Sequence, residues 1–317
     1  MNTYRPCADG EIIAALDLGS NSFHLLLAEL RADGWRAQLR SGDKVQLAAG
    51  LQSGLLNEVA IARGLACIER LAPMLRPLPP QSVRIVATHT LRVARNRADF
   101  IEPAQLLLGH PIEVISGDTE ATLVYRGVAD TAQTRPQLVV DIGGGSTELA
   151  LGSGPEIERR ASIPVGCVTC RSHFPDGRLD PLLFEQAYDA VCNQLREHWS
   201  QILPSPIAVL GSSGTLLAIE QVLIGQGWSG QIGGEQGITR AGLLRLQQAL
   251  LTFGRLDAVE FPGLSARRRS VFTTGVAIAR ALFDVLGIEH MSLSQAALRE
   301  GLVEDLLLRR RALASSR

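Results

Sequence analysis

Two turns in this sequence are rich in glycine and serine, and each follows an aspartate at the end of an apolar run. Asp17 precedes the first turn and Asp141 precedes the second. Glycine accepts positive φ and has no Cβ, so the backbone N–H groups of such a turn can point together into a concavity that fits an anion. The turn residues that we expect to bind phosphate are Ser20, Asn21, Ser22, Gly143, Gly144, Gly145 and Ser146.

The two turns are copies of one another. Residues 17–27 read DLGSNSFHLLL and residues 141–151 read DIGGGSTELAL, with five of eleven positions identical. Each copy lies between two apolar runs, which is typical of a β-hairpin. An internal repeat of this kind predicts two related lobes, with one turn from each lobe facing a cleft between them.

Three carboxylates accompany the turns: Asp17 before the first, and Asp141 and Glu148 on either side of the second. Carboxylates repel a phosphate unless a cation lies between them. Hard oxygen ligands that share a metal ion with phosphate favour Mg²⁺, with Mn²⁺ as an alternative. Other interpretations stay open, because the aspartates could only cap their turns and Glu148 could be a solvated strand residue.

Glu120 and Arg92 each follow a strand-like segment, at the end of the strand where sites of α/β proteins form. Glu120 could orient and deprotonate a water molecule, although a glutamate in the first turn of a helix is commonly only a dipole partner. Arg92 could reach phosphate with its planar fork of donors, although a solvated or salt-bridged arginine is common. His89 is expected to be a packed or hydrogen-bonded histidine.

Strand-like and helix-like segments alternate along the chain, which predicts an α/β protein. Each half begins with a β-hairpin or meander. The expected strands are residues 12–16, 23–30, 35–40, 83–87, 112–115, 138–141, 147–151, 207–210 and 291–293. The expected helices are residues 57–75, a stretch ending at 108, 118–129, 181–202, a helix opened by the turn at 211–215, 240–251, 265–286 and 297–311.

The composition excludes several classes of protein. With 31 basic and 32 acidic residues the formal net charge is −1, so the chain lacks the basic excess of a protein that binds nucleic acid by bulk charge. No apolar run approaches the ~18 residues of a membrane span. The first six residues are not followed by the apolar core of a signal peptide. We therefore expect a cytoplasmic protein that binds neither nucleic acid nor membrane.

The five cysteines are an odd number in a mid-sized chain, which does not fit the disulfide framework of a secreted protein. Cys167 and Cys170 form a Cys-x-x-Cys motif that could be a redox pair or half of a zinc site. No second pair stands at a zinc-ligand spacing from it. Two ordinary reduced thiols are therefore the preferred interpretation.

Six segments together resemble the exopolyphosphatase / guanosine pentaphosphate phosphohydrolase (Ppx/GppA) family, in the family's order and over nearly the whole chain. They are DLGSNSFH (17–24), ATHTLR (87–92), ISGDTEA (115–121), VDIGGGSTE (140–148), GSSGT (211–215) and ALREG (297–301).

The resemblance implies a two-lobed, actin-like fold, related to ribonuclease H and the sugar kinases, with a substrate cleft between the lobes. The implied domains are residues 1–128 and 129–298, and the final helix, about residues 299–315, is a candidate to pack back on the first lobe. The chain resembles the short form, without the C-terminal HD-like domain of longer members. Relatives form dimers, so a homodimer is expected.

The resemblance also assigns roles to the candidate residues. Glu120 becomes the general base that activates the attacking water. Asp141, Glu148 and Asp17 become the Mg²⁺ ligands, and a monovalent cation is a further possible cofactor. Arg92 and the residues of the two turns become the phosphate-binding groups.

Three positions depart from the family pattern. Thr122 stands where an arginine is common, which removes one cation. Lys44 stands where an arginine is usual, a point charge in place of a fork. Gln295 stands where an aspartate is usual.

The function implied by these observations is Mg²⁺-dependent removal of the terminal phosphate from inorganic polyphosphate. A pppGpp 5′-phosphohydrolase is the alternative within the family, and nothing in the residues separates the two. Two further hypotheses are an actin-like kinase that needs an acceptor and a non-catalytic sensor of polyphosphate or nucleotide.

Overall fold

The structure of the chain is a computed structural model. It describes residues 10–199, 203, 207–232 and 235–315. The first six residues, which carry no signal-peptide pattern, lie outside this part. None of the described helices is long and apolar enough to cross a membrane.

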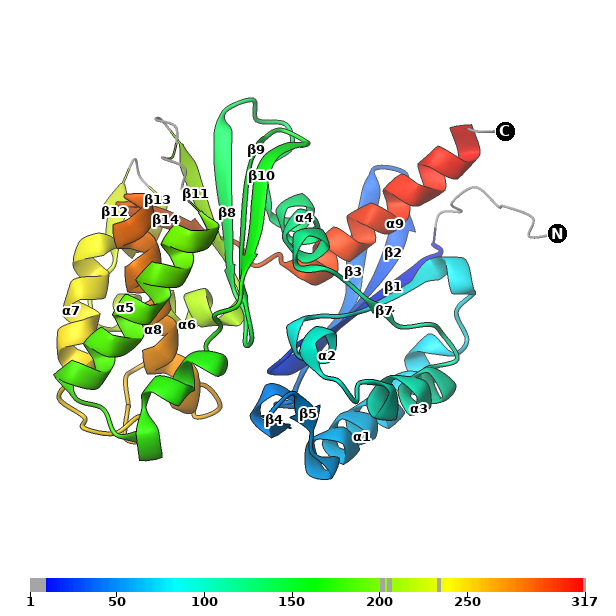
Figure 1. Cartoon of the computed structure of the whole chain (residues 1–317). Coiled ribbons are helices and arrows are strands. Elements are labelled where there is room, and N and C mark those ends of the chain that lie inside the picture. The colour runs from blue at the N-terminus through cyan, green and yellow to red at the C-terminus, as the bar shows by residue number, and fades with distance from the viewer. Residues whose placement is uncertain (1–9, 200–202, 204–206, 233–234, 316–317) are drawn as a thin grey trace. The chain divides into compact units, whose positions relative to one another are not determined.

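The chain divides into two compact units, shown in Figure 1. Unit 1 consists of residues 1–127 and 298–317, and unit 2 consists of residues 128–297. The chain therefore leaves unit 1 once and returns to it with its C-terminal helix.

Unit 1 is built on a five-stranded sheet. Its strands are β1 (Ile12–Leu18), β2 (Ser22–Arg31), β3 (Gly34–Lys44), β6 (Val83–Ala87) and β7 (Glu113–Val114). The order is β3-β2-β1-β6-β7, with an antiparallel meander of the first three strands followed by two strands parallel to β1. Residues 13–16 of β1 are all buried, as expected for a central strand that is covered on both faces.

A small ribbon and five helices complete unit 1. The ribbon pairs β4 (Leu51–Gln52) with β5 (Leu55–Leu56). The helices are α1 (Glu58–Leu75), α2 (His89–Val93), α3 (Ala98–Leu108), α4 (Gly117–Val128) and α9 (Leu298–Ser315).

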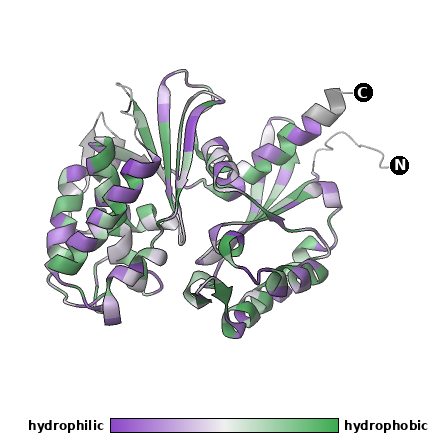
Figure 2. Ribbon diagram, viewed as in Figure 1, coloured by the Kyte–Doolittle hydropathy of each residue, from purple (hydrophilic) through white to green (hydrophobic). Residues whose placement is uncertain are grey.

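Helix α1 begins where the sequence predicts, because Asn57 caps it. The Asn57 side chain accepts a hydrogen bond from the backbone N–H of Ala60 at 2.9 Å, which satisfies one of the free donors of the first turn. The buried residues of α1 recur at helical spacing, including Gly64, Ile68 and Leu71. Figure 2 shows hydrophobic and hydrophilic residues mixed along the helices, as expected where a helix buries one face and exposes the other.

Helix α9 packs on unit 1 through Gly301. A Cβ added at Gly301 would lie 1.8 Å from the backbone oxygen of Leu123 in α4, so only glycine allows the two helices to approach this closely. Ion pairs strengthen the attachment: Asp305 of α9 pairs with Arg126 at 2.6 Å and with the buried Arg84 of β6.

Unit 2 contains a seven-stranded sheet. Its strands, in sheet order, are β10 (Glu156–Ile163), β9 (Thr147–Ser153), β8 (Pro136–Ile142), β11 (Ala208–Ser212), β14 (His290–Leu293), β13 (Glu235–Thr239) and β12 (Gly230–Ile232). Its α-helices are α5 (Pro181–His198), α6 (Gly214–Gly225), α7 (Arg240–Leu250) and α8 (Arg269–Leu286).

The two sheets share one strand order. In unit 2 the order β10-β9-β8-β11-β14 repeats the order β3-β2-β1-β6-β7 of unit 1, with three antiparallel strands followed by two parallel ones. This duplicated arrangement is that of the actin-like, ribonuclease H-like fold, so the expected fold class is confirmed. The hairpins β1-β2 and β8-β9 occupy equivalent positions, which agrees with the internal repeat.

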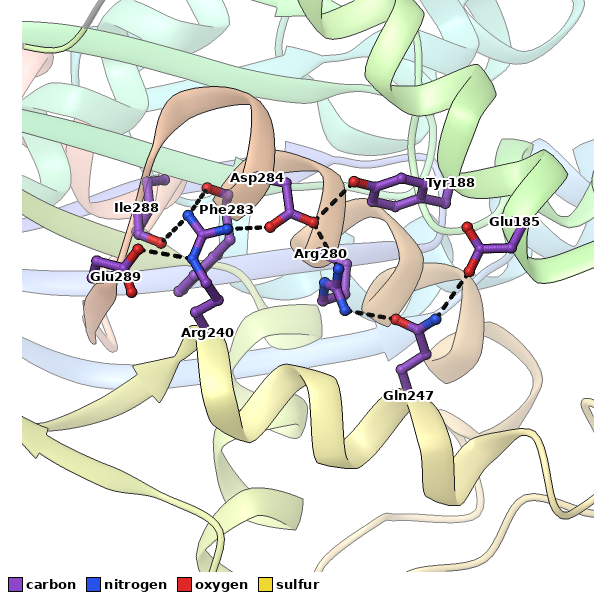
Figure 3. A network of polar contacts seen from close by, with 9 residues as sticks. All are labelled: Glu185, Tyr188, Arg240, Gln247, Arg280, Phe283, Asp284, Ile288 and Glu289. Carbon is purple, nitrogen blue, oxygen red and sulfur yellow. Dashed lines mark hydrogen bonds and ion pairs between the residues drawn. The ribbon is translucent and has the colours of Figure 1, made fainter. Parts of the chain in front are cut away.

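A network of charged side chains ties α5, α7 and α8 together in unit 2 (Figure 3). Asp284 accepts hydrogen bonds from Tyr188 at 2.9 Å and Arg280 at 2.7 Å, and it pairs with Arg240. Burial by itself would raise the pKa of Asp284, but the bonds from Arg280 and Tyr188 and the two guanidinium charges hold that pKa below its ordinary value. Asp284 is therefore ionised at neutral pH.

The sequence missed several strands and misplaced some boundaries. The third strand extends to Lys44, and β10 follows directly after β9; neither has an apolar run because one face of each is exposed. The ribbon β4-β5 and the pair β12-β13 were not expected either. The helix predicted at 265–286 begins only at Arg269. The predicted end of the helix at 181–202 lies partly outside the described residues.

Candidate active site

The candidate residues of unit 1 gather at one edge of its sheet. The parallel strands β1, β6 and β7 end there side by side: the N–H of Thr88 donates to Leu18 O at 3.4 Å, and that of Ile115 donates to Ala87 O at 3.1 Å. The segments that follow these strands carry the first turn, Arg92 and Glu120. The carboxyl edge of parallel strands is where α/β proteins bind ligands.

The first turn is held in place by bonds from three directions. Gly19 N–H donates to Ser22 O at 3.2 Å and closes the turn. The Ser20 hydroxyl is buried and accepts bonds from the N–H and the hydroxyl of Thr90, at 3.3 and 2.8 Å. Asn21 O accepts bonds from two residues after β3, at 3.0 and 2.8 Å. The turn is therefore a fixed platform rather than a free loop.

Asp17 lies at the carboxyl end of β1, across the hairpin from His24. Its Oδ2 is 3.5 Å from His24 Nδ1. Its Oδ1 is buried and has no hydrogen-bond partner among the described residues, and the same holds for Asn21 Oδ1. Buried oxygens without partners are costly, and a cation or an ordered water molecule would satisfy them.

Glu120 is buried and directly paired with Arg92. Arg92 Nη1 donates to Glu120 Oε2 at 2.9 Å and to Ile115 O at 3.0 Å. Only 9% of the Glu120 side chain is exposed, against 23% for Arg92. Ser116 caps the helix that carries Glu120 by accepting a bond from Thr119 N–H at 3.1 Å. The carboxylate is thus fixed by its helix and by the guanidinium.

His89 lies three residues before Arg92 on the same short helix, α2. Burial and the charge of Arg92 lower the pKa of His89 to about 4. The imidazole is therefore neutral at neutral pH and adds no positive charge to this edge, in line with the interpretation of His89 as a packed histidine.

In unit 2, the carbonyl oxygens of the three turn glycines accept hydrogen bonds from one neighbouring segment. Gly143 O accepts a bond from Cys167 N–H at 2.9 Å, and Gly144 O accepts bonds from Val168 and Thr169 N–H at 2.8 and 3.2 Å. The Thr169 hydroxyl reaches the next carbonyl of the turn at 3.4 Å. Residues 166–169 therefore form a brace behind the turn, which we call the brace segment.

This arrangement directs the N–H groups of the turn away from the brace segment. In a planar trans peptide the N–H points opposite to the carbonyl, so the N–H groups of Gly144, Gly145 and Ser146 face the other side. Within the described residues Gly144 and Gly145 N–H have no acceptor. Successive backbone N–H groups that point together form a site for an anion.

The brace segment fits because Gly166 has no side chain. A Cβ added at Gly166 would lie 2.4 Å from Gly144 C and 2.5 Å from Gly145 N. The Thr274 hydroxyl, fully buried on α8, anchors the segment from behind by donating to Cys167 O at 2.6 Å. Sequence reasoning did not select Gly166 or Thr274, because their importance depends on contacts that are remote along the chain.

Cys167 and Cys170 of the sequence motif lie in and beside the brace segment as free, buried thiols. Burial raises the pKa of Cys170 to about 12 and raises that of Cys167 as well. Among the described residues no group of three or more His, Cys, Asp or Glu side chains could hold a metal ion. Both cysteines are free and buried, and their thiol pKa values are raised.

Asp141 and Glu148 are directly opposite one another on β8 and β9. Glu148 is 3% exposed, and its Oε1 accepts a bond from Ser162 at 2.7 Å. Its other oxygen, Oε2, lies 4.0 Å from where a Cβ on Gly143 would be. Two carboxylates next to an anion site fit Mg²⁺, which usually binds one or two carboxylates and takes its other ligands from phosphate and water.

Another turn of unit 2, at residues 211–215, lies next to a positively charged side chain that the sequence analysis did not select. Ser213 caps α6 and adopts φ 103°, which is rare outside glycine. The guanidinium of Arg268 lies over Gly214, 1.6 Å from where a Cβ would be. Burial lowers the pKa of Arg268, opposed by the nearby Cys167 thiol. The residue lay in a run of three arginines, and nothing in the sequence pattern distinguished it.

The structure thus brings the candidate residues together in two groups. Asp17, the first turn, Arg92 and Glu120 lie at the sheet edge of unit 1. Asp141, the second turn and Glu148 lie at the equivalent hairpin of unit 2. Of the positions that depart from the family pattern, Thr122 bonds within its own helix to Asp118 O at 2.8 Å, and Lys44 lies opposite Ser22 at the end of β3.

The structure is thus a duplicated actin-like fold with a glycine- and serine-rich turn in the equivalent hairpin of each unit. The chain belongs to the Ppx/GppA phosphatase family, whose model matches residues 31–310. It is therefore a phosphatase of the kind that hydrolyses phosphoanhydride bonds.

Solved structures share the fold at low sequence identity. An exopolyphosphatase-like protein is 23% identical with a TM-score of 0.80, covering 96% of this chain and 100% of its own. An exopolyphosphatase from Cytophaga hutchinsonii is 21% identical with a TM-score of 0.76, covering 94% and 98%. The Aquifex aeolicus PPX-GPPA enzyme is 22% identical with a TM-score of 0.72, covering 92% and 99%.

Proposed function

We propose that this protein is an exopolyphosphatase that hydrolyses the terminal phosphate of inorganic polyphosphate. The observation that carries the proposal is the second turn, whose successive N–H groups face away from the brace segment. Two of these groups have no acceptor among the residues that the structure describes. Such a turn suits a phosphoryl group. The likeness in fold to proteins named exopolyphosphatases supports the choice of substrate.

In this proposal Glu120 is the general base. A carboxylate held on a helix and against Arg92 can orient a water molecule for in-line attack on the terminal phosphorus and accept its proton. Arg92 keeps the carboxylate in position and offers its remaining N–H groups to phosphate oxygens. The first turn, through Ser20, Asn21 and Ser22, binds phosphate from unit 1.

The N–H groups of Gly144, Gly145 and Ser146 would bind oxygens of the phosphoryl group as negative charge builds up on them. Arg268 lies in the same unit and can add a further positive charge. Asp141 and Glu148 would hold Mg²⁺, with Asp17 as a further ligand from unit 1. The metal ion, when bound, offsets the charge that develops on the leaving phosphate oxygen.

The test of the proposed function is phosphate release by the purified protein. Tripolyphosphate, polyphosphate of about 100 residues and pppGpp are compared, with Mg²⁺, with Mn²⁺ and with EDTA. The proposal expects turnover of polyphosphate that EDTA abolishes. Faster turnover of pppGpp than of either polyphosphate would assign the chain to the nucleotide substrate instead. Tight binding of polyphosphate without release of phosphate would make the protein a sensor.

A further inference from the structure

Four exposed arginines of unit 1, among the described residues, bind main-chain oxygens rather than carboxylates. Arg76 bonds to Leu107 O at the end of α3, and the other three bond to segments that are connected to the first turn. The first is Arg63 on α1, which donates from Nη2 to Gln46 O at 2.8 Å and from Nε to Val45 O. The second and third are Arg95 and Arg97, in the segment between α2 and α3. All three side chains are exposed, so their charges face solvent.

The other two guanidinium groups are fixed in the same manner. Arg95 Nη2 donates to Ser53 O at 2.8 Å, and its side chain lies over the turn glycine Gly54. Arg97 Nη1 donates to Arg92 O at 3.3 Å. One side of each guanidinium group is thus held by a main-chain oxygen. The remaining N–H groups can donate to a ligand.

None of the three forms an ion pair with a described residue, which sets them apart from most arginines of unit 1. Arg70, Arg84 and Arg92, for example, all pair with carboxylates. The nearest acidic residue in sequence to Arg97, Asp99, accepts a bond from Asn96 instead. A carbonyl oxygen is neutral, so each of the three guanidinium groups keeps its full positive charge.

The main-chain segments that hold these arginines also hold the first turn. The N–H groups of Val45 and Gln46, whose carbonyls bind Arg63, both donate to Asn21 O. Thr90 of α2, which donates to Ser20, lies two residues before the carbonyl that binds Arg97.

Arg95 is connected to the first turn less directly than Arg63 and Arg97 are. It contacts the tip of the ribbon β4-β5, which follows directly on the segment that contacts Asn21 and Ser20. The three arginines are therefore linked to the first turn through the main-chain segments that they bind.

We propose that Arg63, Arg95 and Arg97 form a binding site for the part of a polyphosphate chain that lies beyond the reacting phosphate. A linear phosphoanhydride polymer carries about one negative charge per residue, so it matches a series of fixed, uncompensated guanidinium groups. The inference rests on the proposed function and deepens it, because it places the distal polymer on α1 and on the segment between α2 and α3.

The test uses the full chain with Arg63→Gln, Arg95→Gln and Arg97→Gln combined. Glutamine removes the charge and keeps an amide donor, on a shorter side chain. The matched control is Arg36→Gln, an exposed arginine without an ion pair among the described residues. It lies at the far end of β3, about 26 Å from Lys44 at ~3.3 Å per residue. Thermal unfolding verifies that all variants are folded.

The measurement is KM for phosphate release, with Mg²⁺, from tripolyphosphate and from polyphosphate of about 100 residues. For the triple variant we expect KM for the long polymer to rise about tenfold more than KM for tripolyphosphate. The slope of log KM against log salt should fall by about 2 for the long polymer, since each lost phosphate contact lowers it by roughly 0.7. The control should match the wild type on both substrates.

The outcomes separate the inference from the proposed function. Wild type that releases phosphate from neither polyphosphate would refute the proposed function and the inference with it. Wild type that is active, with a triple variant equal to the control on the long polymer, would refute the inference alone. An equal loss on both polyphosphates would place the arginines at the reacting phosphate and overturn the inference.

Discussion

Substitution of Gly166 by alanine would displace the second turn from behind. The new Cβ would lie 2.4 Å from Gly144 C, 2.5 Å from Gly144 O and 2.5 Å from Gly145 N. All three atoms belong to the main chain, so no side-chain rotation relieves the clash. An ordinary contact begins near 3.4 Å, and the turn or the brace segment must therefore move by about 1 Å.

A displacement of that size in a catalytic group lowers the rate by about 10²-fold. We therefore expect kcat/KM for phosphate release from polyphosphate to fall by about that factor in Gly166→Ala. The cost in stability should be smaller, about 1–3 kcal/mol, as for other overpacked sites. Phosphate release and thermal unfolding, measured on the same preparation, distinguish the two effects.

Thr274 provides a second variant that leaves Gly166 intact. Thr274→Val keeps the shape of the side chain and removes its bond to Cys167 O, whereas Thr274→Ser retains the hydroxyl. The valine variant should lose activity and the serine variant should restore it. A folded Gly166→Ala protein with kcat/KM within twofold of wild type would show that the position of the second turn is not critical, and would refute the reasoning.

Three further predictions concern the structure around the sites. Gly301→Ala should destabilise the protein by about 1–3 kcal/mol or more in thermal or urea unfolding, because its Cβ would lie 1.8 Å from Leu123 O; an unchanged midpoint would contradict the close packing of α9 on α4. Asp284→Asn should cost roughly 1.5–3 kcal/mol near neutral pH. Because the pKa of Asp284 is lowered in the folded state, wild type has this stability in full above the ordinary pKa of the carboxyl and loses it as the pH falls below that value; a difference between the two proteins that does not shrink in acid would refute the assignment. Cys167 and Cys170 should react with a disulfide reagent at pH 8 only after unfolding, since both thiols are buried and their pKa values are raised; fast reaction of the folded protein would contradict this.

The internal repeat that begins at Asp17 and at Asp141 predicted the two hairpins and the two related units. It could do so because the local sequence determines whether a hairpin forms. An aspartate, a glycine-rich turn and two apolar runs are enough to form strands that pair with their neighbours. Asn57 predicted the start of α1 for the same reason, since a cap acts within three residues. Strand β10 was missed because its pattern depends on which face of the sheet is covered, and that is decided by α5 and the rest of the unit.

The candidate sites were only partly accessible to sequence reasoning. Glu120 and Arg92 could be selected because each follows a strand, but their pairing at 2.9 Å depends on β6 and β7 lying side by side. Gly166 and Arg268 were not selected at all. Their roles arise from contacts with residues 22 and 54 positions away in the chain, and one sequence carries no sign of such contacts.

The most direct test of the proposed hydrolysis compares wild type with Glu120→Gln. Glutamine keeps the size of the side chain and can still bond to Arg92, but it cannot accept the proton of the attacking water. Glu102→Gln, an exposed substitution on α3, is the matched control. We predict that kcat for phosphate release from polyphosphate falls by about 10²-fold or more in Glu120→Gln, with polyphosphate binding retained and the control unchanged. Glu120→Gln that turns over polyphosphate at the wild-type rate would contradict the assignment of Glu120 as the base.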